Sequence, residues 1–172
     1  NSWFVFSDPR RFGHLDLLQS GNEAAHPLLA AMGVEPLSNA FSQTYLDEVL
    51  AGRKQPIKTA LLDQRLIAGL GNIYVSEALF KAGISPRRQA GNVVGKRAQR
   101  LAPAIRNVLN AAIEQGGTSL RDHVQPGGEI GYFVQSLQVY GRGGEPCNSC
   151  STPIKVIRQG GRSSFYCPNC QH

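Results

Sequence analysis

Four cysteines near the end of the chain are the residues with the most distinctive chemistry. Cys147, Cys150, Cys167 and Cys170 are the only cysteines among 172 residues, and they form two Cys-x2-Cys pairs separated by sixteen residues. Two such turns, brought together by a hairpin, can present four thiolates to one tetrahedral ion. Two disulfides are the alternative, but the spacing favours a single structural Zn²⁺ ion with no open coordination position.

The segment between the two cysteine pairs must bring them together. "PIKVIRQ" predicts a short β-strand, Gly160 and Gly161 predict a tight turn with positive φ, and "RSSFY" predicts a returning strand. A module this small has almost no apolar core, so the metal must hold it, and structural zinc contributes about 10–16 kcal/mol of apparent folding free energy. Arg158 and Arg162 flank the turn, which predicts a cationic tip remote from the metal.

Charge is distributed unevenly along the chain. Residues 1–50 carry two basic and six acidic residues, whereas residues 51–172 carry 16 basic and six acidic residues. This imbalance favours a polyanionic partner, most commonly nucleic acid, although a solvated basic face is equally compatible. The sequence contains no apolar run of about 18 residues and no basic-then-apolar leader, so we expect a cytoplasmic protein with no membrane partner.

The rest of the chain is expected to be mainly α-helical, after a β-strand predicted over residues 1–7. A long apolar stripe from Leu101 to Ile113 ends at a Gly-Gly pair, and Pro103 should kink this helix or mark a later start. The candidate helices are His26–Met32, Ser42–Ala51, Ile57–Asp63, Ile73–Ala82 and Val94–Gln115.

The stretch "AGLGN" lies between two of these predicted helices and predicts tight turns, with Asn72 as the N-cap of the following helix. Backbone N–H groups at a helix start beside glycines form an anion site, and Arg53, Lys54 and Lys58 add positive charge nearby. Neither lysine is expected to have a lowered pKa, because the sequence shows no apolar pocket around it. Glu77 is interpreted as a structural acid near this junction.

A glycine-rich stretch separates the helices from the cysteine hairpin. Residues 116–144 hold eight glycines, which predicts a mobile loop. Composition leaves two roles open: a plain linker, or a segment that closes over a ligand.

Several motifs taken together resemble one family. "DPRRFG", "AGLGNIYVSEALFKAGISP", "EQGGTSLRD", "QVYGRGGEPC" and the four-cysteine hairpin resemble bacterial formamidopyrimidine-DNA glycosylase, a base-excision repair enzyme for 8-oxoguanine and ring-opened purines. The resemblance runs along the whole chain and covers the C-terminal part of such an enzyme. It implies a remnant of a β-sandwich domain over 1–20, a helix–two-turn–helix domain with a lesion-capping loop over 21–140, and a zinc-finger β-hairpin over 141–172.

The resemblance also implies roles for individual residues in the helical and zinc-finger parts. Asn72, with help from Arg53 and Lys58, corresponds to the phosphate grip of the helical junction. Arg162 corresponds to the zinc-finger arginine that binds phosphate at the lesion and is implicated as proton donor in the elimination step. Tyr140 is expected to make a further backbone contact.

The resemblance implies that "PRRFG" fills the gap that a flipped-out base leaves in the DNA stack. Flipping the base out costs a few kcal/mol. Phe12 matches the aromatic wedge, Arg10 the group that hydrogen-bonds the widowed cytosine, and Arg11 a phosphate contact. Without the other motifs, an ordinary surface turn would be the preferred interpretation.

The catalytic centre of the family has no counterpart in this sequence. The family's nucleophile is an N-terminal proline amine followed by a glutamate, whereas this chain starts at Asn1. We therefore expect the parent protein to be a DNA glycosylase with AP lyase activity. The chain as given is expected to bind zinc and double-stranded damaged DNA as a monomer, and to need a missing N-terminal catalytic domain for excision.

Three rival interpretations remain open at this point. The chain could be a zinc-ribbon nucleic-acid-binding module without repair activity. It could belong to an endonuclease VIII-type glycosylase for oxidised pyrimidines, although "PRRFG" speaks against that. A zinc-stabilised protein–protein adaptor is the third.

Overall fold

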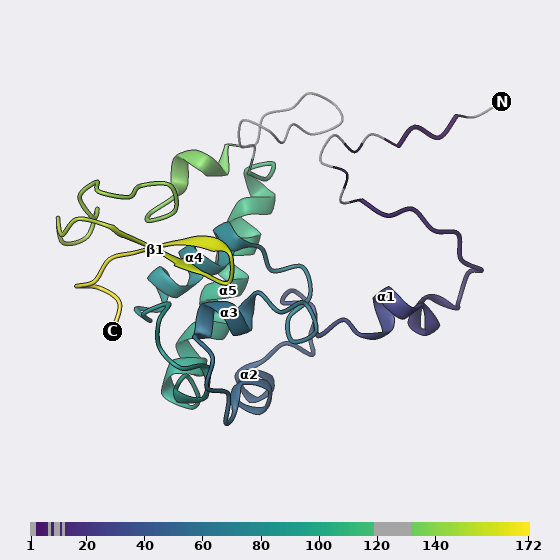
Figure 1. Cartoon of the computed structure of the whole chain (residues 1–172), viewed down its shortest axis with the longest axis horizontal. Coiled ribbons are helices and arrows are strands. Elements are labelled where there is room, and N and C mark those ends of the chain that lie inside the picture. The colour runs from purple at the N-terminus through teal and green to yellow at the C-terminus, as the bar shows by residue number, and fades with distance from the viewer. Residues whose placement is uncertain (1–2, 7, 9–10, 12, 119–131) are drawn as a thin grey trace. The chain divides into compact units, whose positions relative to one another are not determined.

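The protein is described from a computed structural model, which describes residues 3–6, 8, 11, 13–118 and 132–172. The chain divides into two compact units, Asn1–Ala31 and Met32–His172. Figure 1 traces the elements of both units in chain order. No helix within the described ranges has the length and apolar character needed to cross a membrane.

The first unit contains the short helices η1 (Glu23–Ala25) and α1 (Pro27–Ala30). His26 caps α1 by accepting a hydrogen bond from the backbone N–H of Leu28, and its other ring nitrogen lies 2.9 Å from a carboxylate oxygen of Asp16. The strand predicted over residues 1–7 is wrong for the described residues 3–6, which have no regular secondary structure. A strand needs a partner, and no described residue pairs with this segment.

The second unit confirms the predicted helices in type and position. They are α2 (Gln43–Leu50), α3 (Ile57–Leu61), α4 (Asn72–Lys81) and α5 (Lys96–Glu114), with short 3-10 turns η2 (Ala90–Asn92) and η3 (Phe133–Ser136). Ser42 caps α2 by accepting a hydrogen bond from the backbone N–H of Tyr45. Helix α5 runs through Pro103, so a later start at this proline is wrong.

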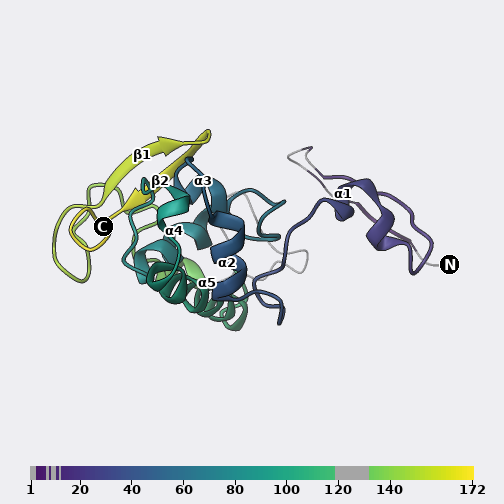
Figure 2. The same ribbon diagram turned by 90° about the horizontal axis from the view of Figure 1, so that it is seen from below.

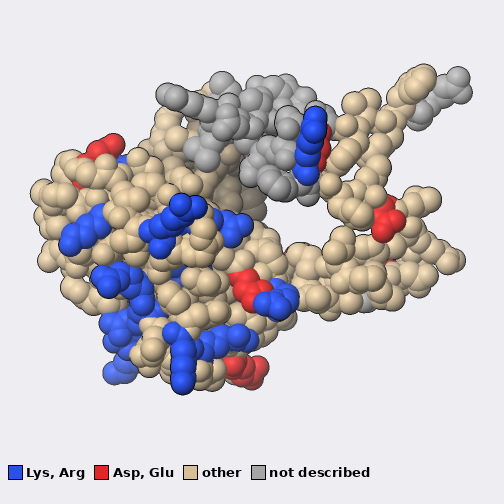
Figure 3. Space-filling view, viewed as in Figure 1, with Lys and Arg blue, Asp and Glu red and all other residues tan. Residues whose placement is uncertain are grey.

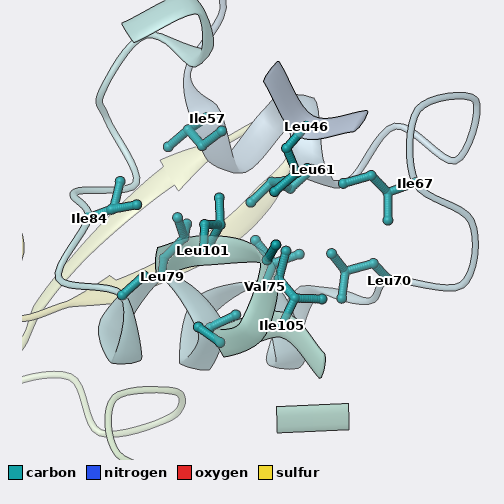
Figure 4. Close-up of a cluster of buried hydrophobic side chains, with 14 of the residues drawn as sticks. Leu46, Ile57, Leu61, Ile67, Leu70, Val75, Leu79, Ile84, Leu101 and Ile105 are labelled. Carbon is teal, nitrogen blue, oxygen red and sulfur yellow. The ribbon is translucent and has the colours of Figure 1, made fainter. Parts of the chain in front are cut away.

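One apolar core lies between these four helices (Figure 4). Helix α5 contributes Leu101 and Ile105, which face Val75 and Leu79 of α4, and all four side chains are fully buried. The 3.6-residue spacing of the apolar positions in α5 explains why one face of this helix is buried and the other is solvated. Burial of this face holds α4 in place, and α4 is the helix that begins at the predicted anion site.

The terminal hairpin forms as predicted, with β1 (Lys155–Gln159) antiparallel to β2 (Arg162–Tyr166). Gln159 pairs with Arg162 across the turn. Gly160 and Gly161 have φ values of 54° and 76°, a region that glycine occupies without strain. Figure 2 shows the hairpin lying alongside α3 and α4 in the second unit.

Candidate nucleic-acid interface

The junction before α4 leaves backbone donors exposed to a ligand. Gly69 has a φ of 74°, which allows the tight turn, and Gly71 is the N-cap of α4. No side chain caps this helix, and among the described residues the N–H groups of Asn72, Ile73 and Tyr74 have no hydrogen-bond partner. Free N–H groups at the start of a helix attract anions.

Asn72 is the first residue of the helix, so its prediction as the N-cap is wrong by one position. The physical reason is that its side chain points to other parts of the chain. Its amide nitrogen donates to the carbonyl oxygen of Ser163 at 3.3 Å and to the hydroxyl of Tyr140 at 3.4 Å. Asn72 therefore joins the helix start to the hairpin and to the segment that precedes it.

The hairpin is attached to the helical part by polar contacts near its turn. The ammonium of Lys58, in α3, donates to the carbonyl oxygen of Ser163 at 2.7 Å. The side-chain amide of Gln159 donates to the carbonyl oxygen of Pro86 at 3.2 Å. The turn that carries Arg162 is thus held beside the start of α4.

The expectation that Lys58 keeps an ordinary pKa is wrong. Lys58 is 0% exposed, and burial together with the nearby charge of Arg162 lowers its pKa to about 8. The pocket around Lys58 includes a hairpin strand more than a hundred residues away in the sequence. The local sequence around Lys58 therefore contains no sign of it.

Glu77 confirms its interpretation as a structural acid. It is 4% exposed, and its carboxylate accepts hydrogen bonds from the backbone N–H groups of Gln138, Val139 and Tyr140 at 2.8–3.0 Å. A buried carboxylate is stable when several donors surround it. Glu77 thereby fixes the segment leading into the zinc hairpin.

Tyr140 lies between the junction and the hairpin. Its ring packs against Phe165 of β2 with the centroids 4.9 Å apart and the planes tilted by 60°. Its hydroxyl accepts a hydrogen bond from Asn72. The structure therefore brings three of the predicted DNA-contacting residues together, since Asn72 donates to Tyr140 and shares the Ser163 carbonyl oxygen with Lys58.

The surface around the hairpin tip is cationic. Arg158 and Arg162 on the hairpin, and Arg53 and Lys54 before α3, are exposed. Within the described ranges, Arg65 and Arg142 are the only Lys or Arg residues that pair with a carboxylate. Figure 3 shows blue Lys and Arg side chains spread over this face of the second unit, with fewer red Asp and Glu side chains among them.

Arg53 lies outside the Asn72 group. Its side-chain nitrogen donates to the carbonyl oxygen of Val49 near the end of α2, and no described contact links it to the hairpin tip. Arg11 belongs to the first unit, where it is exposed with a φ of 57°. Arg10 and Phe12 lie outside the described residues, as does the 119–131 part of the glycine-rich segment.

The four cysteines converge at the end of the hairpin opposite the turn. Their sulfur atoms all lie within 4.8 Å of one another, and the closest pairs are 3.4 Å apart. None forms a disulfide. Zinc–sulfur bonds of about 2.3 Å in a tetrahedron place the sulfurs about 3.8 Å apart, so this geometry fits one structural Zn²⁺ ion.

The thiols differ in how readily they lose a proton. Hydrogen bonds from Thr152 lower the pKa of Cys150 to about 5. Hydrogen bonding to Cys150 raises the pKa of Cys170 to about 12, and burial raises the pKa of Cys167. Neighbouring sulfurs cannot all become thiolates without a cation between them, and a bound metal would supply that charge.

Two family models match the chain. Residues 32–124 match the "Formamidopyrimidine-DNA glycosylase H2TH domain", and residues 144–172 match a "Zinc finger found in FPG and IleRS". The first match covers the helical core and the junction before α4. The second covers all four cysteines and both strands.

Curated relatives extend beyond this chain. The formamidopyrimidine-DNA glycosylase of Ruegeria pomeroyi is 55% identical over 169 residues, which cover 97% of this chain and 60% of the relative. That of Rhodospirillum centenum is 56% identical over 176 residues, which cover 98% of this chain and 61% of the relative. The chain thus spans about three fifths of the length of these relatives.

Solved structures of similar proteins have the same fold. The MutM (Fpg) protein of Thermus thermophilus superposes with a TM-score of 0.89 at 45% identity, covering 95% of this chain and 62% of that one. Lactococcus lactis Fpg, solved with DNA containing an abasic site, superposes with a TM-score of 0.88 at 36% identity, covering 96% and 61%. With its helix–two-turn–helix core and its zinc finger both matched, the chain belongs to the formamidopyrimidine-DNA glycosylase family.

Proposed function

We propose that this chain is the DNA-binding part of a base-excision repair glycosylase with AP lyase activity, which removes 8-oxoguanine and formamidopyrimidines from damaged duplex DNA. The relatives of which it spans three fifths carry the name of that enzyme. Several similar structures are complexes with DNA containing an abasic site or a damaged guanine. Such an enzyme acts on the bacterial chromosome and therefore in the cytoplasm.

One observation carries the DNA-binding role. The free N–H groups at the start of α4 and the exposed guanidinium of Arg162 belong to segments that are joined through Ser163. A helix start and an arginine arranged in this way suit a phosphate group, which accepts several hydrogen bonds at once. We assign this phosphate to the DNA backbone at the lesion.

We assign the remaining contacts by the same reasoning. Tyr140 supplies a hydroxyl beside Asn72, and Arg53 supplies charge along the flanking backbone. We assign Arg10 to a hydrogen bond with the widowed base and Arg11 to a phosphate contact. Phe12 is assigned to fill the gap in the base stack. We assign the bound chain to a monomer. Excision requires the proline nucleophile of a catalytic domain, and Arg162 is assigned as the proton donor of the elimination step.

The binding role is tested with the zinc-loaded chain and a fluorescent duplex that carries a tetrahydrofuran abasic analogue opposite cytosine. If about five phosphates are neutralised, log K against log salt has a slope of roughly −4 to −5. Asn72→Ala and Arg162→Ala should each weaken binding about tenfold. Asn110→Ala on the exposed side of α5 and Lys155→Ala at the metal end of the hairpin are the matched controls.

Unchanged affinity in both variants, with the fold intact, would remove the phosphate assignment. A salt-independent interaction would favour a protein–protein adaptor instead. Lesion preference is tested separately, by joining the chain to the catalytic domain of a relative and comparing cleavage of 8-oxoguanine and thymine-glycol duplexes. Preferential cleavage of the thymine-glycol duplex would assign the parent enzyme to the endonuclease VIII type.

A further inference from the structure

Lys58 is the one buried Lys or Arg among the residues that the structure describes. Its ammonium forms no ion pair with any described carboxylate. The recorded partner of its ammonium is a neutral backbone carbonyl oxygen, that of Ser163. Burying a cation costs several kcal/mol unless it is well paired, so a function is needed to explain why a lysine occupies this position.

The burial of Lys58 argues against a direct contact with DNA. A side chain with no solvent-accessible surface cannot reach a phosphate unless the hairpin moves away. Arg162, whose charge acts on Lys58, is exposed, so a ligand from solvent can reach its guanidinium. The predicted role of Lys58 as a helper of the phosphate grip must therefore be an indirect one.

The carbonyl group that Lys58 binds occupies a central position. Ser163 directly follows Arg162, and its carbonyl oxygen also accepts a hydrogen bond from the amide of Asn72. Two residues from different helices thus hold the same peptide group, one from α3 and one from the start of α4. This arrangement fixes the backbone of Arg162 relative to the free N–H groups of α4.

Among the described residues, three side chains hydrogen-bond the turn end of the hairpin to the helical part: Lys58 and Asn72, which bind Ser163, and Gln159, which binds Pro86. A Cβ atom on Gly160 would lie 3.8 Å from the methyl carbon of Thr59, so the turn passes close to α3. Without Lys58, this end of the hairpin would keep the hydrogen bonds of Asn72 and Gln159 but lose the shortest of the three.

We propose that Lys58 is a positioning residue that does not touch DNA and that holds the zinc hairpin at the helical junction, so that Arg162 and the start of α4 meet the same phosphate. The proposal rests on the DNA-binding function proposed above and adds to it a residue that acts through another. Truncating Lys58 should therefore remove the contribution of Arg162.

The charge of Lys58 provides a second readout. Its pKa of about 8 means that the free protein loses this proton above that pH. A phosphate bound at Arg162 raises the pKa of Lys58 again, because an anion nearby favours the ammonium. DNA binding should therefore take up a proton above about pH 8, and affinity should fall as pH rises through this range.

Other ionisable groups around Lys58 should not produce the same fall in affinity with pH. Arg162 on β2 is the charged residue that acts on it, and Arg88 lies on the 86–90 segment that packs against the start of α3. Arginine side chains do not lose their proton in proteins. Tyr140→Phe, which removes the hydroxyl that accepts a hydrogen bond from Asn72, is included as a control.

The decisive experiment is a double-mutant cycle with Lys58→Met and Arg162→Ala, measured by binding of the abasic-analogue duplex. Each single variant should lose about tenfold in affinity, and the double variant should lose no more than either alone. Lys81→Met, at the exposed end of α4, removes the same charge without touching the hairpin and should leave affinity nearly unchanged. The fall in affinity above about pH 8 should persist in Tyr140→Phe and disappear in Lys58→Met.

Independent losses that multiply in the double variant would overturn the proposal and make Lys58 a direct contact. So would a pH dependence that survives in Lys58→Met. Amide hydrogen exchange without DNA separates the two proposals: Lys58→Met should speed exchange at residues 162–164 while the helical core stays protected. If the wild-type chain bound no DNA, the proposed function would fail, but this exchange result would still test the positioning role.

Discussion

The helical part of the second unit, residues 32–118, buries apolar side chains from all four of its helices. The hairpin part has a far smaller apolar cluster, whose buried members are Val139, Cys147, Ile154 and Cys167. Two of those four are cysteines of the metal site. Side-chain packing accounts for the stability of the first region, whereas the second depends on an ion.

The contacts between these two regions are of two kinds. Phe80 of α4 packs against the apolar cluster of the hairpin part. Buried polar groups also join the two regions, namely Lys58 to Ser163, Glu77 to residues 138–140, and Gln171 to Ile84. Directional contacts of this type fix a geometry but add little net stability. The comparison indicates that the core supports the interface and that the metal shapes the hairpin. The polar contacts set the angle between the helical part and the hairpin.

Removing the metal should produce the largest effect. A chelator should unfold residues 144–172 and leave the helices in place, because zinc contributes about 10–16 kcal/mol to such a finger. DNA affinity should fall about a hundredfold, since Arg162 and the hairpin end of the interface are lost together. Circular dichroism should report retained helix, and hydrogen exchange should report lost protection in the hairpin.

Zinc added back to the chelated chain should restore both affinity and protection. If the hairpin stayed protected without metal, the contrast between the two regions would be wrong. Melting of the helices together with the hairpin would show instead that the core depends on the metal.

A core truncation should give the next largest effect and act on the other region. Leu101 is fully buried at the centre of the helical core, so Leu101→Ala should lower the free energy of unfolding by about 2–5 kcal/mol. At 25 °C the metal site should remain, as read from the thiolate absorption of bound Co²⁺. Ile113→Ala on the same helix, where the side chain is 64% exposed, should change stability by less than about 0.5 kcal/mol.

Local patterns in the sequence predicted the parts whose structure is decided locally. The apolar spacing in α5 gave the helix, and the Cys-x2-Cys pairs with an intervening Gly-Gly turn gave the hairpin and its metal site. The errors at Asn72 and Lys58 have one cause: each residue meets a partner that is distant in the sequence. Asn72 leaves the N-cap role to bind Ser163, and Lys58 is buried by the same strand.

The smallest of these effects should come from the joint between the two regions. In Glu77 one carboxylate oxygen accepts hydrogen bonds from Val139 and Tyr140, and the other accepts one from Gln138. In Glu77→Gln the side-chain NH₂ would face the N–H of Gln138, so one buried donor would lose its acceptor. We expect the free energy of unfolding to fall by about 1–3 kcal/mol.

Glu77→Gln should speed hydrogen exchange in the segment that leads into the hairpin more than it does in the helices. Faster hydrogen exchange should be confined to residues 138–140 and the adjoining hairpin, because those segments lose their anchor while the core keeps its packing. Glu114→Gln, at the exposed end of α5, removes the same charge as a control and should leave exchange unchanged. Equal loss of protection throughout α4 and α5 would mean that Glu77 supports the core rather than the joint, and the division between a packed helical region and a hairpin oriented by polar contacts would then be wrong.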